Sequence, residues 1–464
     1  MRRNNLLKML LILTIAGGMA LAANGQESGV RAGSGIVAPA APARAPSSAG
    51  AVRLDSYSQF VDEVNGATPD DLIRYAFQHN GELAAARQMI AEAEGRLNQA
   101  GLKANPMVES NYQQGVTSAD NNFTIGAELP LEPGRRAARV AVATSELELA
   151  RAETADFERK LTAEVRARLA EVLAAARNLK FSEELLGLDQ DSHRLVHALV
   201  ELGKRAPLEE STLLVEVNRA DAMRAANLGR AESALFELKK TIGMPRDEPL
   251  RLHDEFARDF QPARQADLVR DALLLRPDLQ AARAAEKLAK ARVEQARVEG
   301  RIDASIFANY QRMATSFDQR GFNSQGLLVP VAGIFHFASF GVRLALPVRN
   351  KNQGAVEAAL AAAEGARQTE QFAENAILNE VASACVRFEQ ARKARTLYHD
   401  GVLEPATRNL DVIRQTYAFG QKTLLDYLTE QRRYADLEAD YTNVLKEYFD
   451  AMAAIQTATG TEVH

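Results

Sequence analysis

Apolar side chains recur every three or four residues through the stretch of the chain between Gly134 and Gly203. This spacing places them on one stripe of an α-helix. The stretch contains no proline and is rich in alanine, glutamate, arginine and leucine, which are good helix formers. It therefore predicts one helix on the order of 100 Å long, at about 1.5 Å per residue. Taken alone, such a helix is typical of a coiled coil or rod, because it is too long for one small core.

The same pattern occurs a second time, in residues 350–420, with a similar length and alanine-rich composition. Gly401 and Pro405 fall inside this copy and predict a bend there. A Leu-Pro pair precedes each stretch, at 129–130 and at 346–347, and the distance from its proline to the terminal glycine is the same in both copies. The chain therefore contains a duplicated unit of about 200 residues.

Each unit also contains two shorter helical patterns. An opening helix is expected over 68–103 in the first copy and over 265–301 in the second, where Pro277 bends or breaks it. A returning helix is expected over 207–242 and over 424–459. Stacked end to end, an opening and a returning helix match one long helix, so each chain offers four columns of equal height.

Between the opening helix and the long helix, the helical period gives way to alternation of apolar and other residues. The alternating segments are 123–129 and 340–346, and their expected partners are 107–116 and 305–313. Each copy therefore supplies a β-hairpin with strands of about ten residues. Strands of this kind suit a membrane barrel with lipid outside and water inside. A hairpin packed on a soluble core is the alternative.

The two alternating segments are in register with each other, which predicts one lipid-facing set of side chains. Arg343 is expected on the opposite side, toward the lumen. The predicted lipid-facing residues are Phe123, Ile125, Phe340, Val342 and Leu344.

Four strands per chain cannot close a membrane barrel, because known barrels begin at eight strands. Lipid offers no hydrogen bonds to free strand edges, so the edges must pair with other copies. A dimer would give eight strands, with an interior filled by side chains. A trimer would give twelve strands and leave a lumen, so it is the smallest assembly that could conduct.

The amino terminus has the pattern of a secretory signal peptide over residues 1–22, with basic residues followed by an apolar run. Residues 23–67, rich in alanine, proline, glycine and serine in their first half, predict a flexible arm or linker. The two repeated units then occupy 68–250 and 251–464. No apolar run suitable for a transmembrane helix follows residue 22. The formal net charge of −5 disfavours a nucleic-acid partner.

No residues form a catalytic constellation, so no enzymatic activity, cofactor or metal site is predicted. His193 and His197 are four residues apart, which is ligand-like spacing, but no HExxH glutamate accompanies them. Two solvated histidines on a helix are the simpler interpretation. The single cysteine, Cys385, lies among apolar residues and is expected to be a packed, inert thiol.

These features together resemble the TolC-like outer-membrane efflux proteins over about residues 68–460. The resemblance rests on the duplication, on the Leu-Pro and glycine entry to each long helix, and on turns at 202–204 and 419–421. It implies a mainly α fold with a transmembrane β-barrel part. A homotrimer would form a twelve-stranded barrel surrounded by outer-membrane lipid, and the barrel would continue into a tunnel of twelve helical columns. The tunnel would cross the periplasm of a Gram-negative bacterium.

The resemblance also implies partners and a role. An inner-membrane pump, of the RND type, and a periplasmic adaptor would deliver substrates to a passive exit duct. Residues 347–354, and more loosely 275–279, resemble the heavy-metal-efflux (CzcC-type) branch, which favours metal cations as substrates. Drug efflux and type I protein secretion are the alternative roles. A non-conducting periplasmic coiled-coil protein is an alternative of a different class.

By the same resemblance, a gate lies at the periplasmic end of the tunnel. Tyr417, Lys422 and Asp426 match the family's gate tyrosine, basic partner and acidic ring position, whereas Thr429 stands where the family has a second acid. Glu209 lies six residues after Gly203, as Asp426 lies six after Gly420, and it is a candidate partner of Lys422 on a neighbouring helix. Three copies of one carboxylate in a pore would favour cations. Alternatively, both acids simply stabilise the first turn of a helix.

Overall fold

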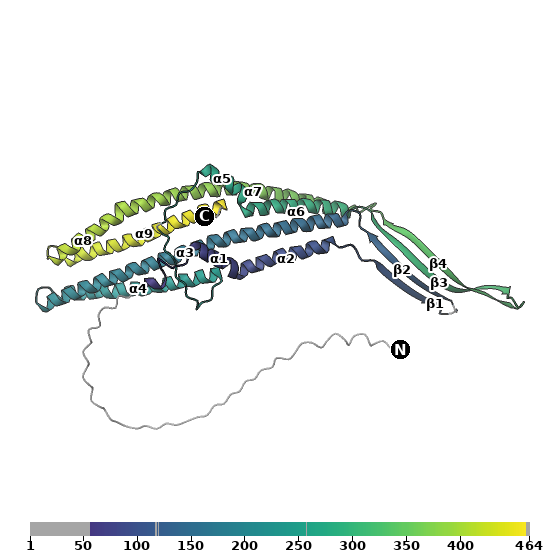
Figure 1. The fold of residues 1–464 in the computed structure, drawn as a ribbon, viewed down its shortest axis with the longest axis horizontal. Coiled ribbons are helices and arrows are strands. Elements are labelled where there is room, and N and C mark those ends of the chain that lie inside the picture. Colours follow the sequence, from purple (N-terminus) through teal and green to yellow (C-terminus); the bar gives the residue numbers. More distant parts are fainter. Residues whose placement is uncertain (1–55, 117, 119, 257, 461–464) are drawn as a thin grey trace, which may run out of the picture. The chain divides into compact units, whose positions relative to one another are not determined.

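The computed structural model of the protein describes residues 56–116, 118, 120–256 and 258–460, and all of them belong to one compact unit. The predicted signal peptide and most of the predicted linker lie outside the described residues. Figure 1 shows helices and strands in the duplicated order that the sequence predicts, with one four-stranded sheet. Among the described residues, no helix is both long and apolar enough to cross a membrane.

The first unit contains four helices among its described residues. Their bounds are α1 Pro69–His79, α2 Gly81–Gly101, α3 Arg135–Glu201 and α4 Pro207–Ile242. The prediction of a single opening helix over 68–103 is wrong, because the chain breaks at Asn80. Asn80 has an extended backbone (ψ 119°), and its side-chain oxygen accepts from the Leu83 N–H, which starts α2. Its amide nitrogen donates to the Thr241 carbonyl, which fixes the break against the end of α4.

The second unit repeats this arrangement. Its helices are α5 Gln265–Leu275, α6 Pro277–Glu299, α7 Gln353–Tyr398, α8 Glu404–Ala418 and α9 Leu424–Thr459. The predicted break before Pro277 is confirmed. At Gly401 the second long helix changes to one π-helical turn, η2 (His399–Leu403), and Pro405 lies in the first turn of α8. The two copies thus differ here, since α3 is continuous.

The long helices hold the shorter ones in place. α3 packs against α2 and α4, and also against α6 and α9 of the other unit. α7 packs against α6 and α9. The opening and returning helices of each unit therefore follow one another along a long helix, as Figure 1 shows.

The main core lies where the shorter helices meet, around the middle of α3. Val165, Leu169 and Val172 of α3 are fully buried in it, together with Phe388 of α7 and Leu445 of α9. Phe60 and Val61 also belong to this core, at 3% and 4% exposure. Val61 and Ala67 form parallel bridges with Leu252. The linker prediction is therefore wrong for residues 56–67, because Phe60 and Val61 are buried in the core and the backbone pairs with another segment, although Val64 is exposed.

The sheet is antiparallel, with strand order β1-β2-β3-β4. Its strands are β1 Met107–Gln114, β2 Asn121–Leu131, β3 Asp303–Phe322 and β4 Leu328–Ala345. Pairing of β2 with β3 joins the two hairpins into one sheet. The first hairpin has nearly the predicted length. The second is about twice as long as predicted, at 20 and 18 residues, because pairing continues past the segment of clean alternation and through a bulge near Phe317.

Candidate functional site

The two turns at which the helices reverse have the same backbone geometry. Gly203 and Gly420 have φ of +69° and +76°, a left-handed conformation that glycine adopts without strain. The Lys204 N–H donates to the Leu199 carbonyl and the Gln421 N–H to the Thr416 carbonyl, which satisfies the end of each helix. The chain then enters α4 at Pro207 and α9 at Leu424.

Three side chains connect these two turns, and we call Arg205, Glu209 and Tyr417 the tip cluster. The Tyr417 hydroxyl donates to Glu209 Oε2 at 3.2 Å, and Arg205 Nη1 donates to the same oxygen at 3.3 Å. Arg205 Nη2 also donates to the Tyr417 carbonyl at 3.1 Å, with the guanidinium 4.9 Å from the ring centroid. One carboxylate thus joins the start of α4 to the end of α8.

Tyr417 is held from its other side by a small apolar core. Its ring stacks on Tyr427 with centroids 5.6 Å apart and planes at 5°. Val196, Leu213 and Leu410 complete the surroundings, and Tyr417 is only 5% exposed. Burial and the nearby Glu209 carboxylate raise the pKa of Tyr417 to about 12, so its hydroxyl remains a hydrogen-bond donor at neutral pH.

Asp426 and Lys422 lie at the same turn but outside this cluster. Asp426 forms a capping box with Thr423 at the start of α9, and these hydrogen bonds lower the pKa of its carboxyl. Lys422 forms no ion pair with the described residues of its own chain. Thr429 bonds to the Leu425 carbonyl within α9. Within one chain, the partner of Glu209 is therefore Arg205 and not Lys422. A bond between Lys422 and Glu209 of different copies stays a prediction.

Sequence reasoning missed Arg205. It lies four residues before Glu209, which is the spacing of an ion pair on one helical turn, and this spacing was the available signal. No sequence pattern indicates its contact with Tyr417, which is 212 residues away.

The sheet is the second candidate site. Residues directly opposite each other on neighbouring strands share a face. Phe340 pairs with Ala308, which pairs with Ala127 of the strand that carries Phe123 and Ile125. All five predicted lipid-facing side chains therefore lie on one face, which we call face A. It is rich in exposed apolar side chains: Ile125 42%, Leu129 46%, Ile306 47%, Phe340 88%, Val342 60% and Leu344 55%.

The opposite side of the sheet, face B, carries the polar side chains at the same level, although Phe307 also lies there, with Arg343 over its ring. Arg343 donates to Glu128, which also accepts from the Ser305 hydroxyl. Asn309 pairs with Ser339 two rows further along the same face. Arg343 is therefore on the opposite face from Val342 and Leu344, in the register that the sequence predicts.

The apolar band of face A has a limited height. On β2 it extends from Leu131 to Phe123, about 26 Å along the strand at about 3.3 Å per residue. Tilted by about 40°, such a strand spans about 20 Å, close to the band of about 25 Å in membrane barrels. The row of Phe123 also contains Arg312 and His336, and Tyr310 lies beside it. Tyrosine at this level is typical of a barrel's aromatic girdle.

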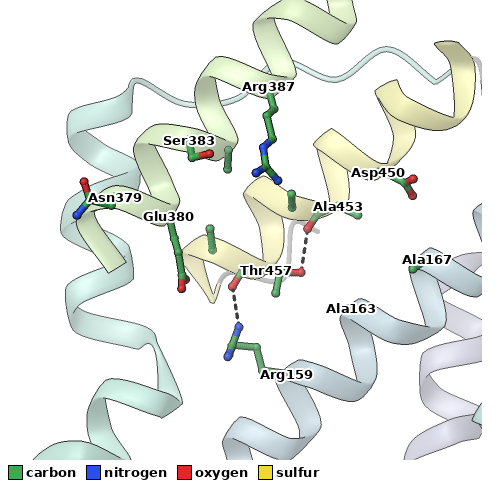
Figure 2. Close-up of a pocket in the computed structure, with 13 residues that line it drawn as sticks. Arg159, Ala163, Ala167, Asn379, Glu380, Ser383, Arg387, Asp450, Ala453 and Thr457 are labelled. Atoms are coloured by element: carbon green, nitrogen blue, oxygen red, sulfur yellow. Dashed lines mark hydrogen bonds between the residues drawn. The ribbon is translucent and has the colours of Figure 1, made fainter. Parts of the chain in front are cut away.

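A cavity of about 560 Å³ lies between α3, α7 and α9 (Figure 2). Alanine is the commonest residue of its walls, and Arg159 donates to the Thr457 carbonyl at 3.5 Å across it. Its charges largely have partners in the chain: Arg159 pairs with Asp156, Asp450 with Lys446, and Glu380 with the buried Arg276. We interpret this region as a structural joint where α6 meets α9.

The described residues contain no cluster of histidine, cysteine and carboxylate side chains that could hold a metal ion. The rings of His193 and His197 lie 6.3 Å apart, and His197 Nδ1 contacts Glu210 at 2.8 Å. Cys385 packs against the main core, and burial raises the pKa of its thiol. Neither feature forms a site for chemistry.

Comparison with known proteins gives a family match. The family model described as outer membrane efflux protein matches residues 72–244 and 268–461. The cobalt-zinc-cadmium resistance protein CzcC of Cupriavidus metallidurans is 23% identical over 385 residues, covering 82% of this chain and 87% of CzcC.

Solved structures show the same fold at low identity. CusC matches with a TM-score of 0.70 and 16% identity, over 85% of this chain and 92% of CusC. The CmeC outer membrane channel of Campylobacter jejuni matches with 0.69 and 14% identity, over 84% and 85%. The MtrE outer membrane channel of Neisseria gonorrhoeae, in its open state, matches with 0.67 and 20% identity, over 90% and 93%.

Proposed function

Because the chain belongs to the outer membrane efflux protein family, we propose that three copies form a passive exit duct for metal cations. The family consists of outer-membrane channels with a periplasmic helical part, and not of enzymes. The predicted family, location and lack of enzymatic activity are thereby confirmed. The trimer, the substrate and the partner proteins belong to the proposal.

Face A is the observation that best supports a membrane barrel. It presents an exposed apolar band of nearly membrane height on a sheet of four strands, and its outer strands, β1 and β4, each have one edge without a partner strand among the described residues. Lipid leaves no partner for such edges, so β4 of one copy pairs with β1 of the next. Three copies give twelve strands with face A toward lipid and Arg343 toward the lumen.

Arginine at position 342 tests this assignment. Near the bilayer midplane, Val342→Arg should cost about 2–4 kcal/mol. We expect loss of the heat-resistant oligomer on gels of outer-membrane fractions. Ser339→Arg, on face B of the same strand, is the matched control and should assemble normally. Normal assembly of Val342→Arg would contradict a lipid-facing face A.

The tip cluster supports a gate at the periplasmic end of the tunnel. It holds the α3–α4 and α8–α9 turns together within each copy. We propose that Lys422 and Asp426, which lie outside the cluster, contact neighbouring copies around the axis. A periplasmic adaptor, working with an inner-membrane pump of the RND type, would favour the open arrangement by binding it more tightly.

The metal substrate is supported by one relative. CzcC is named for cobalt, zinc and cadmium resistance and aligns over most of both chains. The fold alone does not choose a substrate, since the solved channels match about equally well. A strain lacking this protein should lose tolerance to salts of these metals but keep its tolerance to hydrophobic drugs. The reverse pattern would favour drug efflux.

A further inference from the structure

The sheet continues above the first hairpin as only two strands. The last pair between β2 and β3 joins Asn121 to Ala314, whereas β3 runs on to Phe322 before β4 begins at Leu328. We call residues 311–337 the distal hairpin; its lowest rows, up to Ala314 and Ile334, still pair with β2, and residues 315–333 form two strands alone. A two-stranded hairpin alone is at best marginally stable in water, so this segment needs another surface to pack on.

The apolar side chains change faces at the row of Arg312 and His336. Below this row the large apolar side chains lie mainly on face A. Above it, within residues 313–317 and 331–336, Ile334 is the one large apolar residue of face A. Face B carries a set that we call the aromatic surface: Met313, Phe317, Val331, Phe335 and, one row lower, Phe337.

The aromatic surface is organised within the chain but not covered by it. The rings of Phe317 and Phe335 meet edge to face, with centroids 6.3 Å apart. A Cβ at Gly333 would lie 3.1 Å from the Phe335 ring, so glycine leaves space for the ring. Even so, Phe317, Phe335 and Phe337 remain 46%, 40% and 47% exposed. An exposed apolar patch of this kind marks an interaction surface.

We infer that three distal hairpins pack together through their aromatic surfaces and narrow the outer mouth of the channel. The inference rests on the proposed trimer, because face B points to the threefold axis when face A meets lipid. β1, with 8 residues, is too short to pair with the upper part of β4 in the next copy. Residues 315–333 therefore rise free above the ring of twelve strands and carry Phe317 and Val331, while Phe335 lies in the uppermost rows of the ring. The other two copies are the protein surfaces nearest to each aromatic surface.

Cysteine cross-linking in the full-length protein tests this. In a Cys385→Ala background, Phe335→Cys places a thiol on the aromatic surface, and His336→Cys places one on face A at the next residue. Cells are treated with a short bismaleimide, and the products are separated on denaturing gels. We expect most Phe335→Cys protein to run as a covalent dimer, since single thiols can link two of three copies. His336→Cys should remain monomeric. Phe317→Cys provides a second position should Phe335→Cys fail to assemble.

The outcomes separate this inference from the proposed function. A heat-resistant trimer without dimers at positions 335 and 317 would overturn the packing of the hairpins and leave the trimeric channel standing. Equal cross-linking at 335 and 336 would also overturn it, because the thiols would then meet without regard to face. Absence of any trimer in the parent protein would refute the proposed function itself.

Discussion

Replacement of Glu209 by alanine should open the periplasmic end of the channel. Glu209 accepts hydrogen bonds from both Arg205 and Tyr417, so the variant removes the shared acceptor of the tip cluster. The side chains of Arg205 and Glu209 are 19% and 27% exposed, so solvent screens their attraction. Each of the two interactions is therefore worth about 1 kcal/mol.

Because the channel has three copies, the variant loses this free energy three times, and the sum is large enough to shift the balance between closed and open states. Two interactions give about 2 kcal/mol per copy and about 6 kcal/mol for three copies that open together. An equilibrium moves from 99:1 to 1:99 with about 5.5 kcal/mol. A channel that is almost always closed should therefore become mostly open.

Single-channel recording in planar bilayers measures this change as a rise in conductance. Glu210→Ala is the matched control, because the neighbouring carboxylate binds His197 and does not contact Tyr417. Its conductance should equal that of the parent protein. The reasoning fails if Glu209→Ala leaves conductance unchanged in an intact trimer, or if Glu210→Ala raises it equally.

Three further outcomes are expected. Asp426→Ala should reduce the cation preference of the channel, measured as a shift in reversal potential; Thr423→Ala loses the same helix cap, worth about 1 kcal/mol, and should keep the preference. The pKa of His197 is raised, mainly by its hydrogen bond to Glu210. The attraction between His197 and Glu210 is therefore at full strength below the ordinary histidine pKa, and it is lost as pH rises through the raised pKa. NMR titration should show that Glu210→Gln lowers the pKa of His197. Arg276→Ala should lower stability by about 1.5–3 kcal/mol, the range for hydrogen bonds to charged groups, because Arg276 is 3% exposed while its partners Asp278 and Glu380 keep 30% and 56% side-chain exposure. Thermal unfolding measures this loss, and Arg264→Ala, an 87% exposed partner of Asp267, should change it little.

The helical part of the fold was predictable because its signals are local and repeated. The Leu-Pro pairs, the glycines after the long helical patterns and the break before Pro277 all fall at or near helix ends that the structure shows. Asn80 was missed because an asparagine inside an amphipathic pattern is compatible with a continuing helix. Its role as a cap depends on the Thr241 carbonyl, which reaches it only through tertiary packing.

The strands and the tip cluster show a different limit. Alternation predicted the side chains of face A and the opposite placing of Arg343, because the register has a period of two. It could not give the length of the second hairpin, since aromatic side chains change faces near Arg312. At the tips, the family resemblance pointed to Tyr417 and Glu209 as separate residues, and only the folded chain brings them to 3.2 Å with Arg205 between them.

The π-helical turn at residues 399–403 makes the two helical hairpins of one chain mechanically unequal. α3 transmits a push from end to end through an unbroken ladder of backbone hydrogen bonds, whereas the ladder between α7 and α8 changes its pattern at this turn. We therefore expect a sideways force on the tips to bend the long helix first at η2, so that α8 moves more than α3 and α4. The tip cluster bonds the end of α8, through Tyr417, to the start of α4, through Arg205 and Glu209. Each copy thus has a flexible point at η2 and a set of hydrogen bonds at the tip of α8. A small force on the tip has its greatest torque at these bonds, because they lie farthest from η2.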